Sequence, residues 1–344
     1  MKIIQVRAST EYLVKIGTDL LPALGCEAAA VCKGRKAAIV SDSNVWPLYG
    51  NAASESLENA GFETVHFVFP AGEESKNGNN YLRLLNFLAE NRLTRSDLIV
   101  ALGGGVVGDL TGFAAATYLR GIAYIQVPTT LLAAVDSSVG GKTAIDLPAG
   151  KNLCGAFYQP RLVLCDTNTL NTLPEDIFRD GCAEVIKYGI LYDPALFSHL
   201  EEKGLAFDRE AVIARCVELK RDVVAEDEFD TGARMKLNLG HTIGHGVEAR
   251  SNFTVSHGKA VAIGIAIVSR AGNCPDADRI LACLNTFGLP AATDCTAKEL
   301  FHYALSDKKR SGGTVHLIVP RKIGHCDIVP TPVEKIQSFI EAGL

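Results

Sequence analysis

Residues 97–109 read DLIVALGGGVVGD, an apolar run of strand character that ends in three consecutive glycines. Short buried strands of this kind are typical of a parallel sheet covered on both faces. The glycines fit the spacing Gly103-x-Gly105-x-x-Gly108, and residues 106–118 are expected to form the helix that follows. Glycine lets the backbone turn tightly and approach a pyrophosphate, whose charge is favoured at a helix N-terminus. The stretch therefore predicts an α/β fold with a dinucleotide site.

Strands and helices alternate around this stretch, which predicts a mainly parallel sheet domain over residues 1–170. Helical periodicity dominates after about residue 173, so an α-helical domain is expected over residues 171–344. Strands are expected at 37–40, 64–69, 97–102, 122–127, 162–165 and 315–319, and helices at 75–91, 106–118, 180–190, 209–226, 234–250, 257–272 and 277–287.

Bulk properties narrow the functional class. The 344 residues are about twice the usual domain size, and the net charge of −5 argues against a broad basic surface for nucleic acid. The N-terminus lacks the apolar core of a signal peptide, and the longest apolar run, residues 260–268, is far too short to span a bilayer. The ten cysteines include no Cys-x-x-Cys pair, which is typical of buried thiols in a reducing compartment. We therefore expect a cytoplasmic protein with no membrane or nucleic-acid partner.

The glycine motif departs from the standard dinucleotide fold, because it lies about a hundred residues into the chain rather than in the first strand–helix unit. The candidate acid for a ribose hydroxyl comes earlier, at Asp42, where the first strand of the sheet is expected to end. A carboxylate there would repel a 2′-phosphate, which favours NAD over NADP.

A second motif points to a metal. Asn238, His241 and His245 recur at helical spacing and are predicted to share one helix face, and His257 begins the next helical run. Glu184 lies in an apolar helical segment where an unpartnered carboxylate would be costly. Two histidines and a glutamate form a known catalytic zinc arrangement, although each histidine alone could be an ordinary core residue. Spacing leaves open whether His241 or His245 is the ligand.

Cationic side chains recur beside these motifs. Lys142 and Lys151 follow glycine-rich segments, and Lys187 lies one helical turn beyond Glu184. Cations that gather in an acidic protein indicate an anionic substrate that bears phosphate or carboxylate. The set comprises Arg120, Lys142, Lys151, Lys187, Lys220, Arg234, Lys308 and Lys309.

These segments together resemble the 3-dehydroquinate synthase family, from residues 41–44 to residues 307–309. The resemblance is most specific in YLRGI at 118–122, QVPTTLLA at 126–133, VDSSVGGKT at 135–143, GKN at 150–152, GAFYQP at 155–160 and AEVIKYG at 183–189. Two departures are Gly246, where the family often has alanine, and Lys259, where it often has glutamate. Lys259 reverses a charge beside His257.

The resemblance implies a role for each matched position. Glu184, His241 and His257 are expected to bind one zinc or cobalt ion, with His245 on the substrate side. NAD contacts are implied at Asp42, Asn44, Glu73, Lys76, Gly104, Gly105, Val106, Val107, Gly108, Asp109, Thr129, Thr130, Leu132, Lys142, Lys151, Thr169, Leu170, Asn171 and Thr172. Catalytic or substrate contacts are implied at Arg120, Asp136, Lys142, Asn152, Lys187, Lys220, Arg234, Asn238, His245 and Lys308.

The activity that the resemblance implies is the conversion of 3-deoxy-D-arabino-heptulosonate 7-phosphate to 3-dehydroquinate in the shikimate pathway. It combines transient oxidation by NAD, elimination of phosphate, reduction and intramolecular aldol closure, in an enzyme expected to be a homodimer. The alternatives are another sugar-phosphate cyclase, whose relatives tend to differ at positions equivalent to Asn238, His245 and Lys308, and a metal- and NAD-dependent polyol dehydrogenase. A polyol dehydrogenase would leave the many phosphate-directed lysines unexplained.

Overall fold

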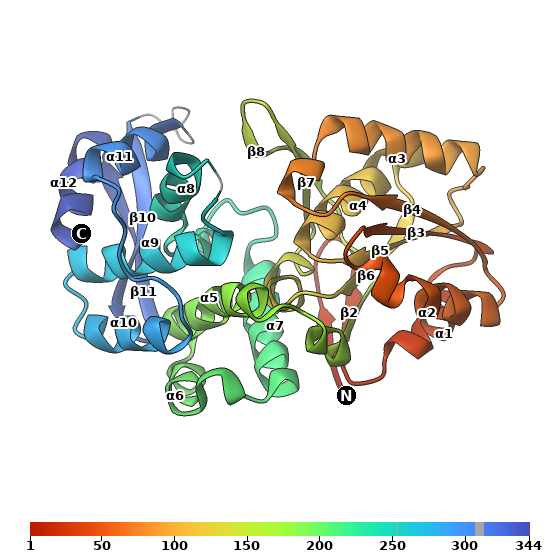
Figure 1. Ribbon diagram of the computed structural model, residues 1–344, viewed down its shortest axis with the longest axis horizontal. Coiled ribbons are helices and arrows are strands. Elements are labelled where there is room, and N and C mark those ends of the chain that lie inside the picture. The colour runs from red at the N-terminus through yellow and green to blue at the C-terminus, as the bar shows by residue number, and fades with distance from the viewer. Residues whose placement is uncertain (253, 307–312) are drawn as a thin grey trace. The chain divides into compact units, whose positions relative to one another are not determined.

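The chain divides into two compact units in the computed structural model, which describes residues 1–252, 254–306 and 313–344 (Figure 1). The first unit comprises Met1–Leu173 and Arg209–Phe229, and the second comprises Pro174–Asp208 and Asp230–Leu344. The expected division after residue 170 differs from these units mainly in the segment 209–229, which packs within the first unit.

The first unit is built on a seven-stranded sheet in the order β1-β2-β9-β6-β5-β3-β4. All neighbouring strands pair in parallel except β1 and β2, which pair antiparallel at one edge. The mainly parallel sheet expected from the sequence is thereby confirmed. Its strands are β1 (Lys2–Val6), β2 (Tyr12–Gly17), β3 (Lys36–Asp42), β4 (Glu63–Phe69), β5 (Leu98–Gly103), β6 (Ala123–Pro128) and β9 (Leu162–Asp166).

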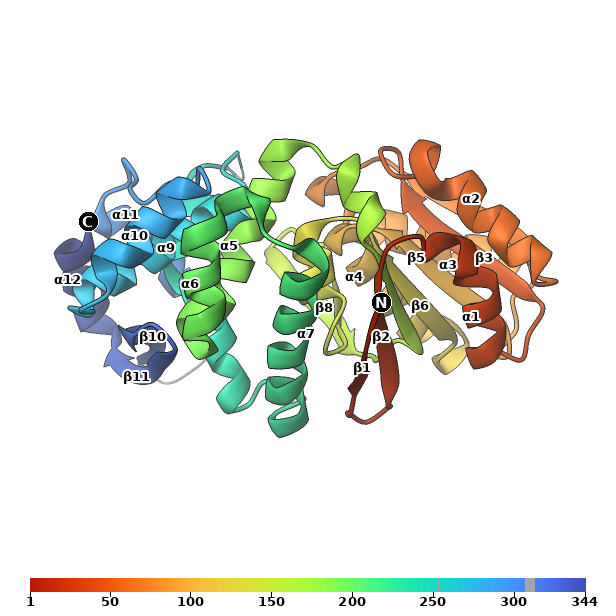
Figure 2. The same cartoon turned by 90° about the horizontal axis from the view of Figure 1, so that it is seen from below.

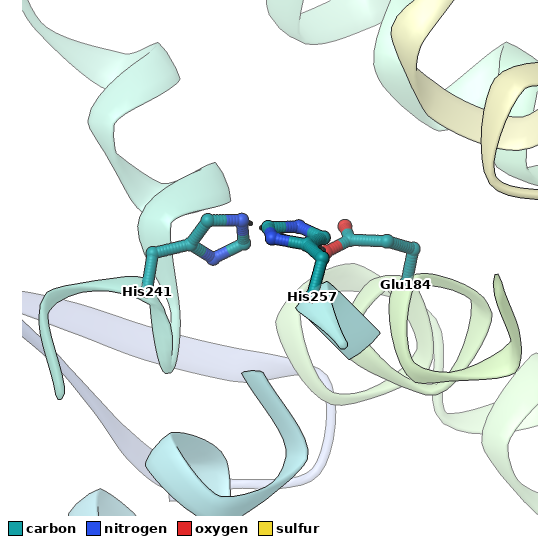
Figure 3. A group of neighbouring side chains, drawn as sticks. All are labelled: Glu184, His241 and His257. Carbon is teal, nitrogen blue, oxygen red and sulfur yellow. Dashed lines mark ion pairs between the residues drawn. The ribbon is translucent and has the colours of Figure 1, made fainter. Parts of the chain in front are cut away.

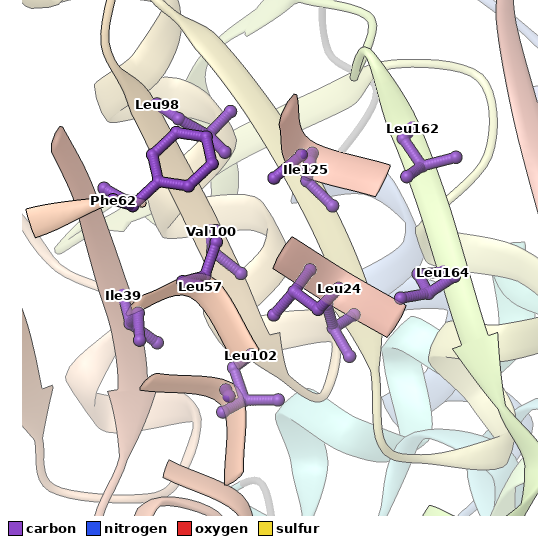
Figure 4. Close-up of a cluster of buried hydrophobic side chains, with 14 of the residues drawn as sticks. Leu24, Ile39, Leu57, Phe62, Leu98, Val100, Leu102, Ile125, Leu162 and Leu164 are labelled. Carbon is purple, nitrogen blue, oxygen red and sulfur yellow. The ribbon is translucent and has the colours of Figure 1, made fainter. Parts of the chain in front are cut away.

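Helices cover both faces of this sheet because its central strands are apolar on both sides. Val100 and Leu102 of β5 pack in one cluster with Leu24 and Leu57 (Figure 4), whereas Ile99 of β5 packs in a separate cluster on the opposite face. The first face carries α1 (Leu24–Val31) and α2 (Trp46–Asn59), and the second carries α3 (Gly78–Glu90) and α4 (Gly105–Thr117).

Three further features complete the first unit. The hairpin of β7 (Lys142–Leu147) and β8 (Gly150–Phe157) forms a separate two-stranded sheet. Helix α7 (Arg209–Glu226) packs beside β1 and β2 (Figure 2). The short helical turns are η1 (Leu21–Ala23), η2 (Glu73–Ser75), η3 (Tyr118–Arg120), the π-helical η4 (Ala133–Ser137) and η5 (Thr167–Asn171).

Among its described residues, the second unit is helical apart from one hairpin, and the sequence predicts the helical character and one of the two strands. Helix α9 is buried along most of its length and packs against α5, α8, α10 and α12, so it forms the centre of this unit. No helix among the described residues combines the length and apolarity needed to cross a membrane. The elements are α5 (Glu175–Tyr192), α6 (Pro194–Lys203), η6 (Gly204–Ala206), η7 (Ala233–Asn238), α8 (His241–Arg250), α9 (His257–Ala271), α10 (Ala277–Thr286), α11 (Ala297–Ser306), α12 (Val333–Gly343), β10 (Thr314–Lys322) and β11 (His325–Pro332).

One predicted helix is wrong, and the error concerns the histidine motif. The sequence predicts a single helix over 234–250, but η7 ends at Asn238 and α8 begins at His241. Leu239 has extended ψ, and Gly240 has a left-handed φ of 79°, a conformation that favours glycine. Asn238 therefore does not share a helix face with His241.

Candidate active site

The glycine turn joins β5 to α4 and makes the tight connection that the sequence predicts. Gly104 caps α4, and the Gly108 N–H donates to its carbonyl at 3.0 Å. A Cβ atom at Gly108 would lie 2.7 Å from Gln126 Oε1, and one at Gly104 would lie 2.9 Å from Thr130 Cγ2. A larger residue at either position would therefore displace a neighbouring side chain, whether or not a pyrophosphate also approaches the turn.

Asp42 lies at the end of β3 and fixes the turn that follows. Its Oδ1 atom accepts hydrogen bonds from the Asn44 N–H at 2.8 Å and from the Val45 N–H at 3.0 Å. One carboxylate oxygen thus holds the backbone, a common role for aspartate in turns.

Lys76 lies at the centre of a polar cluster beside the glycine turn. Its side chain is 4% exposed, and its Nζ atom lies 2.8 Å from Glu73 Oε1, 2.8 Å from Asn152 Oδ1 and 3.3 Å from Asp109 Oδ2. Lys151 Nζ lies 4.0 Å from the same Glu73 oxygen. The structure thus brings together five residues for which the family resemblance implies cofactor or substrate contacts.

Charges in this cluster are strongly coupled. Burial lowers the pKa of Lys76, but Asp109 and Glu73 outweigh burial and raise that pKa above its ordinary value. Burial raises the pKa of Asp109 to about 6, although Lys76 opposes the shift. One ammonium therefore neutralises more than one carboxylate, and Asp109 is the group that titrates near neutral pH.

Sequence reasoning missed Asp146, which belongs to this cluster. Its Oδ1 atom lies 3.8 Å from Lys76 Nζ and accepts a hydrogen bond from the Asn152 N–H at 2.8 Å. Asn152 has a left-handed φ of 56°, so Asp146 holds the backbone in a conformation that non-glycine residues rarely adopt. The signal available in the sequence was an acidic residue five positions before Lys151.

Apart from Lys142, the other residues with implied cofactor contacts follow the carboxyl ends of β6 and β9. The Thr129 N–H donates to the Gly103 carbonyl at 3.0 Å, and Thr130 Oγ1 accepts from the Ala133 N–H at 3.2 Å. Leu132 is the N-terminal cap of η4. Residues 169–172 form and end η5, where the Tyr49 hydroxyl donates to the Thr169 carbonyl at 3.1 Å.

A buried lysine from α7 meets the π-helical turn η4. Lys220 Nζ lies 2.8 Å from Asp136 Oδ1 and donates to the Asp136 carbonyl at 2.7 Å. These are two of the residues with implied substrate contacts, and a π-helical turn is frequent at functional sites. Arg120, at the end of η3, and Lys142, at the start of β7, are both exposed.

Glu184, His241 and His257 come together in the second unit from α5, α8 and α9 (Figure 3). Glu184 Oε1 lies 3.5 Å from His241 Nε2 and 3.6 Å from His257 Nε2. Glu184 is fully buried, and its Oε2 atom forms an ion pair with Lys187. Both imidazoles thus direct the Nε2 atom toward the same carboxylate oxygen.

The three donor atoms fit a divalent metal ion. Ligand atoms about 2.0–2.2 Å from a tetrahedral zinc ion lie roughly 3.3–3.6 Å from one another. The two nitrogen–oxygen distances match this range, and all three donor atoms lie within 4.8 Å of one another. Two histidine nitrogens and a carboxylate oxygen are also the ligand types that zinc prefers at catalytic sites.

The two imidazoles differ in their charge. Burial and Lys187 lower the pKa of His241 to about 3, although Glu184 opposes them. Burial also lowers the pKa of His257, but Glu184 and Glu248 outweigh it and raise that pKa to about 10. A metal ion would therefore meet a neutral His241 and displace a proton from His257.

Asp180 fixes the start of α9 against α5. Its Oδ1 atom accepts hydrogen bonds from Ser256 Oγ at 2.5 Å and from the Lys259 N–H at 3.0 Å. A Cβ atom at Gly258 would lie 1.9 Å from the Asp180 carbonyl oxygen, so the two helices are in close contact here. The Lys259 side chain is exposed, and only its backbone N–H takes part in the bond to Asp180.

Four further residues with implied substrate contacts belong to the second unit. His245 is exposed, and its ring lies 5.7 Å from the His241 ring. Arg234 is buried in η7, and Asn238 ends that turn. Lys308 lies outside the described residues.

Comparisons of the whole sequence with known proteins agree in pointing to one family. Two family models match the chain, described as "3-dehydroquinate synthase N-terminal" over residues 66–180 and "3-dehydroquinate synthase C-terminal" over residues 181–310. A 3-dehydroquinate synthase from Enterococcus faecalis is 42% identical over 358 aligned residues, which cover 100% of both chains.

Two solved structures share the fold along nearly the whole chain. A 2-deoxy-scyllo-inosose synthase complexed with carbaglucose-6-phosphate, NAD⁺ and Co²⁺ is 26% identical, with a TM-score of 0.89 and 100% of both chains covered. A 2-epi-5-epi-valiolone synthase from Streptomyces hygroscopicus with NAD⁺ and Zn²⁺ bound is 28% identical, with a TM-score of 0.88. This second match covers 99% of the present chain and 97% of the other.

Proposed function

The chain belongs to the 3-dehydroquinate synthase family, and we propose that it converts 3-deoxy-D-arabino-heptulosonate 7-phosphate to 3-dehydroquinate and phosphate. The observation that carries this proposal is the 42% identity to a 3-dehydroquinate synthase along the full length of both chains. The donor set of Glu184, His241 and His257 supports it, since the geometry fits a divalent metal ion.

Two bound groups complete the proposed chemistry. When bound, NAD would accept and return a hydride, and a zinc or cobalt ion would lower the pKa of a substrate hydroxyl. Glu184, His241 and His257 would hold the metal ion. Fully buried Glu184 is paired with Lys187, whose ammonium offsets part of the cost of burying the carboxylate.

The residues around the glycine turn would hold NAD. The α4 N-terminus offers backbone N–H groups and a favourable dipole to a pyrophosphate. Lys76 is already oriented by Glu73, Asp109 and Asn152, so this part of the site is ordered by its own contacts. Lys151, which lies near Glu73, would add a second cation.

The cations that the family resemblance assigns to the substrate pocket would bind the anionic groups of the substrate. Arg120, Lys142 and Lys187, with Asn152, would hold the phosphate and orient it for departure. Lys151, Lys220, Arg234 and Lys308 would hold the carboxylate and hydroxyl groups. His245 is exposed, and its imidazole would accept and donate protons while Asn238 orients the hydroxyls.

The proposal extends to the state of the protein in the cell. We propose a cytoplasmic homodimer that has no membrane or nucleic-acid partner. None of the ten cysteines forms a disulfide, which fits a reducing compartment, and dimers are the commonest oligomers of soluble proteins. Sedimentation of the purified protein tests the dimer, because a single species with the mass of one chain would contradict it.

One assay tests the reaction itself. The heptulosonate phosphate is incubated with the protein, a catalytic amount of NAD and Zn²⁺, while phosphate release and absorbance at 340 nm are followed together. We expect stoichiometric phosphate without lasting NADH, because the hydride is returned within each turnover. Lasting NADH from glycerol without phosphate would instead indicate a polyol dehydrogenase. Phosphate release from glucose 6-phosphate but not from the heptulosonate would indicate another sugar-phosphate cyclase.

A further inference from the structure

A second buried carboxylate lies behind one of the metal-binding candidates. Glu248 is 3% exposed, and its Oε1 atom lies 3.7 Å from His257 Nδ1. The opposite ring nitrogen, Nε2, lies 3.6 Å from Glu184 Oε1. The His257 imidazole is thus placed between two carboxylates, one facing each nitrogen.

Helix α8 supplies this carboxylate together with His241. Glu248 and His241 are seven residues apart on α8, which is two helical turns, so they lie on the same face. A buried carboxylate is costly unless a donor or cation compensates it. The same face of α8 therefore carries His241, a candidate metal ligand, and Glu248, a partner for His257 on α9.

His241 has the same arrangement through a different oxygen. Its Nδ1 atom lies 3.1 Å from the Leu239 carbonyl oxygen, while its Nε2 atom faces Glu184. In both rings, then, Nδ1 faces an oxygen acceptor and Nε2 faces the metal-binding oxygen. An Nδ1–H that donates to an oxygen fixes the tautomer with the lone pair on Nε2 and makes that nitrogen a better metal ligand.

We propose that Glu248 is a positioning residue. Its carboxylate accepts a hydrogen bond from the His257 Nδ1–H and thereby orients the His257 Nε2 atom toward the metal ion. A movement of about 0.5 Å would bring the present 3.7 Å contact to ordinary hydrogen-bonding distance. This inference rests on the proposed metal site, and it assigns to α8 a second task beyond carrying His241.

The test measures metal binding rather than turnover alone. Four proteins are compared: the parent, Glu248→Gln, Glu248→Ala and Glu299→Gln. Each is loaded with Zn²⁺ and titrated with a chelator to measure its metal affinity. The visible spectrum of each Co²⁺ form is also recorded. Glu299 is the matched control, because its carboxylate lies on α11 and accepts a hydrogen bond from Arg250 instead. Circular dichroism of the loaded proteins verifies that each variant is folded.

We expect Glu248→Ala to weaken metal binding about 10–100-fold, the usual effect of removing such a partner, and to shift the Co²⁺ spectrum. Glu248→Gln should lose less, because its amide oxygen still accepts from Nδ1–H, and Glu299→Gln should match the parent. If Glu248→Ala does not fold, a weakened affinity and shifted spectrum in Glu248→Gln support the proposal.

Two outcomes separate the inference from the proposed function. If the parent protein itself binds no stoichiometric metal, the proposed metal site is wrong and the role of Glu248 is refuted with it. If the parent binds metal and both folded Glu248 variants keep its affinity and Co²⁺ spectrum, only the positioning role is refuted.

Discussion

The contact between α8 and α9 allows a test in which two physical effects predict opposite changes in the stability of the second unit. Gly264 lies within α9, where alanine is favoured over glycine by about 1 kcal/mol through helix propensity alone. A Cβ atom at this position, however, would lie 1.9 Å from the Gly240 carbonyl oxygen. Gly264→Ala therefore decides whether packing or propensity dominates here.

The size of the effect follows from how little the contact can relax. The methyl group would be about 1.5 Å closer than ordinary van der Waals contact, and the atom it meets belongs to the backbone. That oxygen also accepts the hydrogen bond from the Gly244 N–H at 2.8 Å, so α8 must move as a unit. Over-packing typically costs about 1–3 kcal/mol, and a backbone contact belongs near the top of that range. After the propensity gain, we expect a net loss of about 2 kcal/mol.

Hydrogen exchange monitored by mass spectrometry is the suitable assay, because the single tryptophan, Trp46, lies in the first unit. A loss of about 2 kcal/mol should speed exchange in α8 and α9 about 30-fold. Metal affinity should fall as well, since His241 directly follows Gly240. Gly78→Ala is the control, because no atom lies within 4 Å of a Cβ there. Exchange in Gly264→Ala as slow as in the parent would refute the reasoning.

Three further predictions concern charge and metal. Burial raises the pKa of Asp109 to about 6, above its unfolded value, so the stabilisation from its protonated form is lost as pH rises from about 4 through 6. Asp109→Asn should therefore reduce the pH-dependent change in the free energy of unfolding by about 3 kcal/mol. The measurement is urea unfolding of the cofactor-free protein, followed by Trp46 fluorescence. An unchanged pH profile would contradict this prediction. Lys220→Met should destabilise the first unit by about 2 kcal/mol, seen as a lower urea midpoint, because it removes the buried ammonium from the ion pair with Asp136. His257→Ala should lose bound metal and turnover, whereas exposed His325→Ala should keep both; full phosphate release by His257→Ala in metal-free buffer would contradict the metal role.

Local sequence patterns predict the parts of the fold that depend on neighbours along the chain. The alternation of strands with helices predicts the parallel sheet, and the glycine run after β5 predicts the turn into α4. Both follow because glycine spacing and apolar periodicity act within a few residues. The antiparallel pair of β1 and β2 and the hairpin of β7 and β8 were not predicted, although both pairings join neighbouring segments of the chain. In the hairpin, β8 is largely exposed and the register shifts between Ile145 and Leu147, so the segment lacks the apolar run of a buried strand.

The candidate site also has some features that the sequence predicts and others that it does not. Composition and spacing single out Glu184, His257 and the pair His241 and His245, but helical spacing alone could not choose between the last two. The family resemblance made that choice. The left-handed Gly240 interrupts the predicted helix, and no period in the sequence reveals that break. The burial of Glu248 could not be predicted either, because a buried glutamate and an exposed one look the same in the sequence. Only the packing of α8 on α9 shows which it is.

The chain passes from one compact unit to the other three times, at residues 173–174, 208–209 and 229–230. Consequently, neither unit is a contiguous cassette that recombination could exchange as one piece. A fragment ending at residue 173 would lack α7, leaving β1 and β2 without the helix that packs beside them. Chimaeras between relatives should therefore transfer residues 209–229 along with the sheet, and crossover points that separate the two should yield insoluble protein.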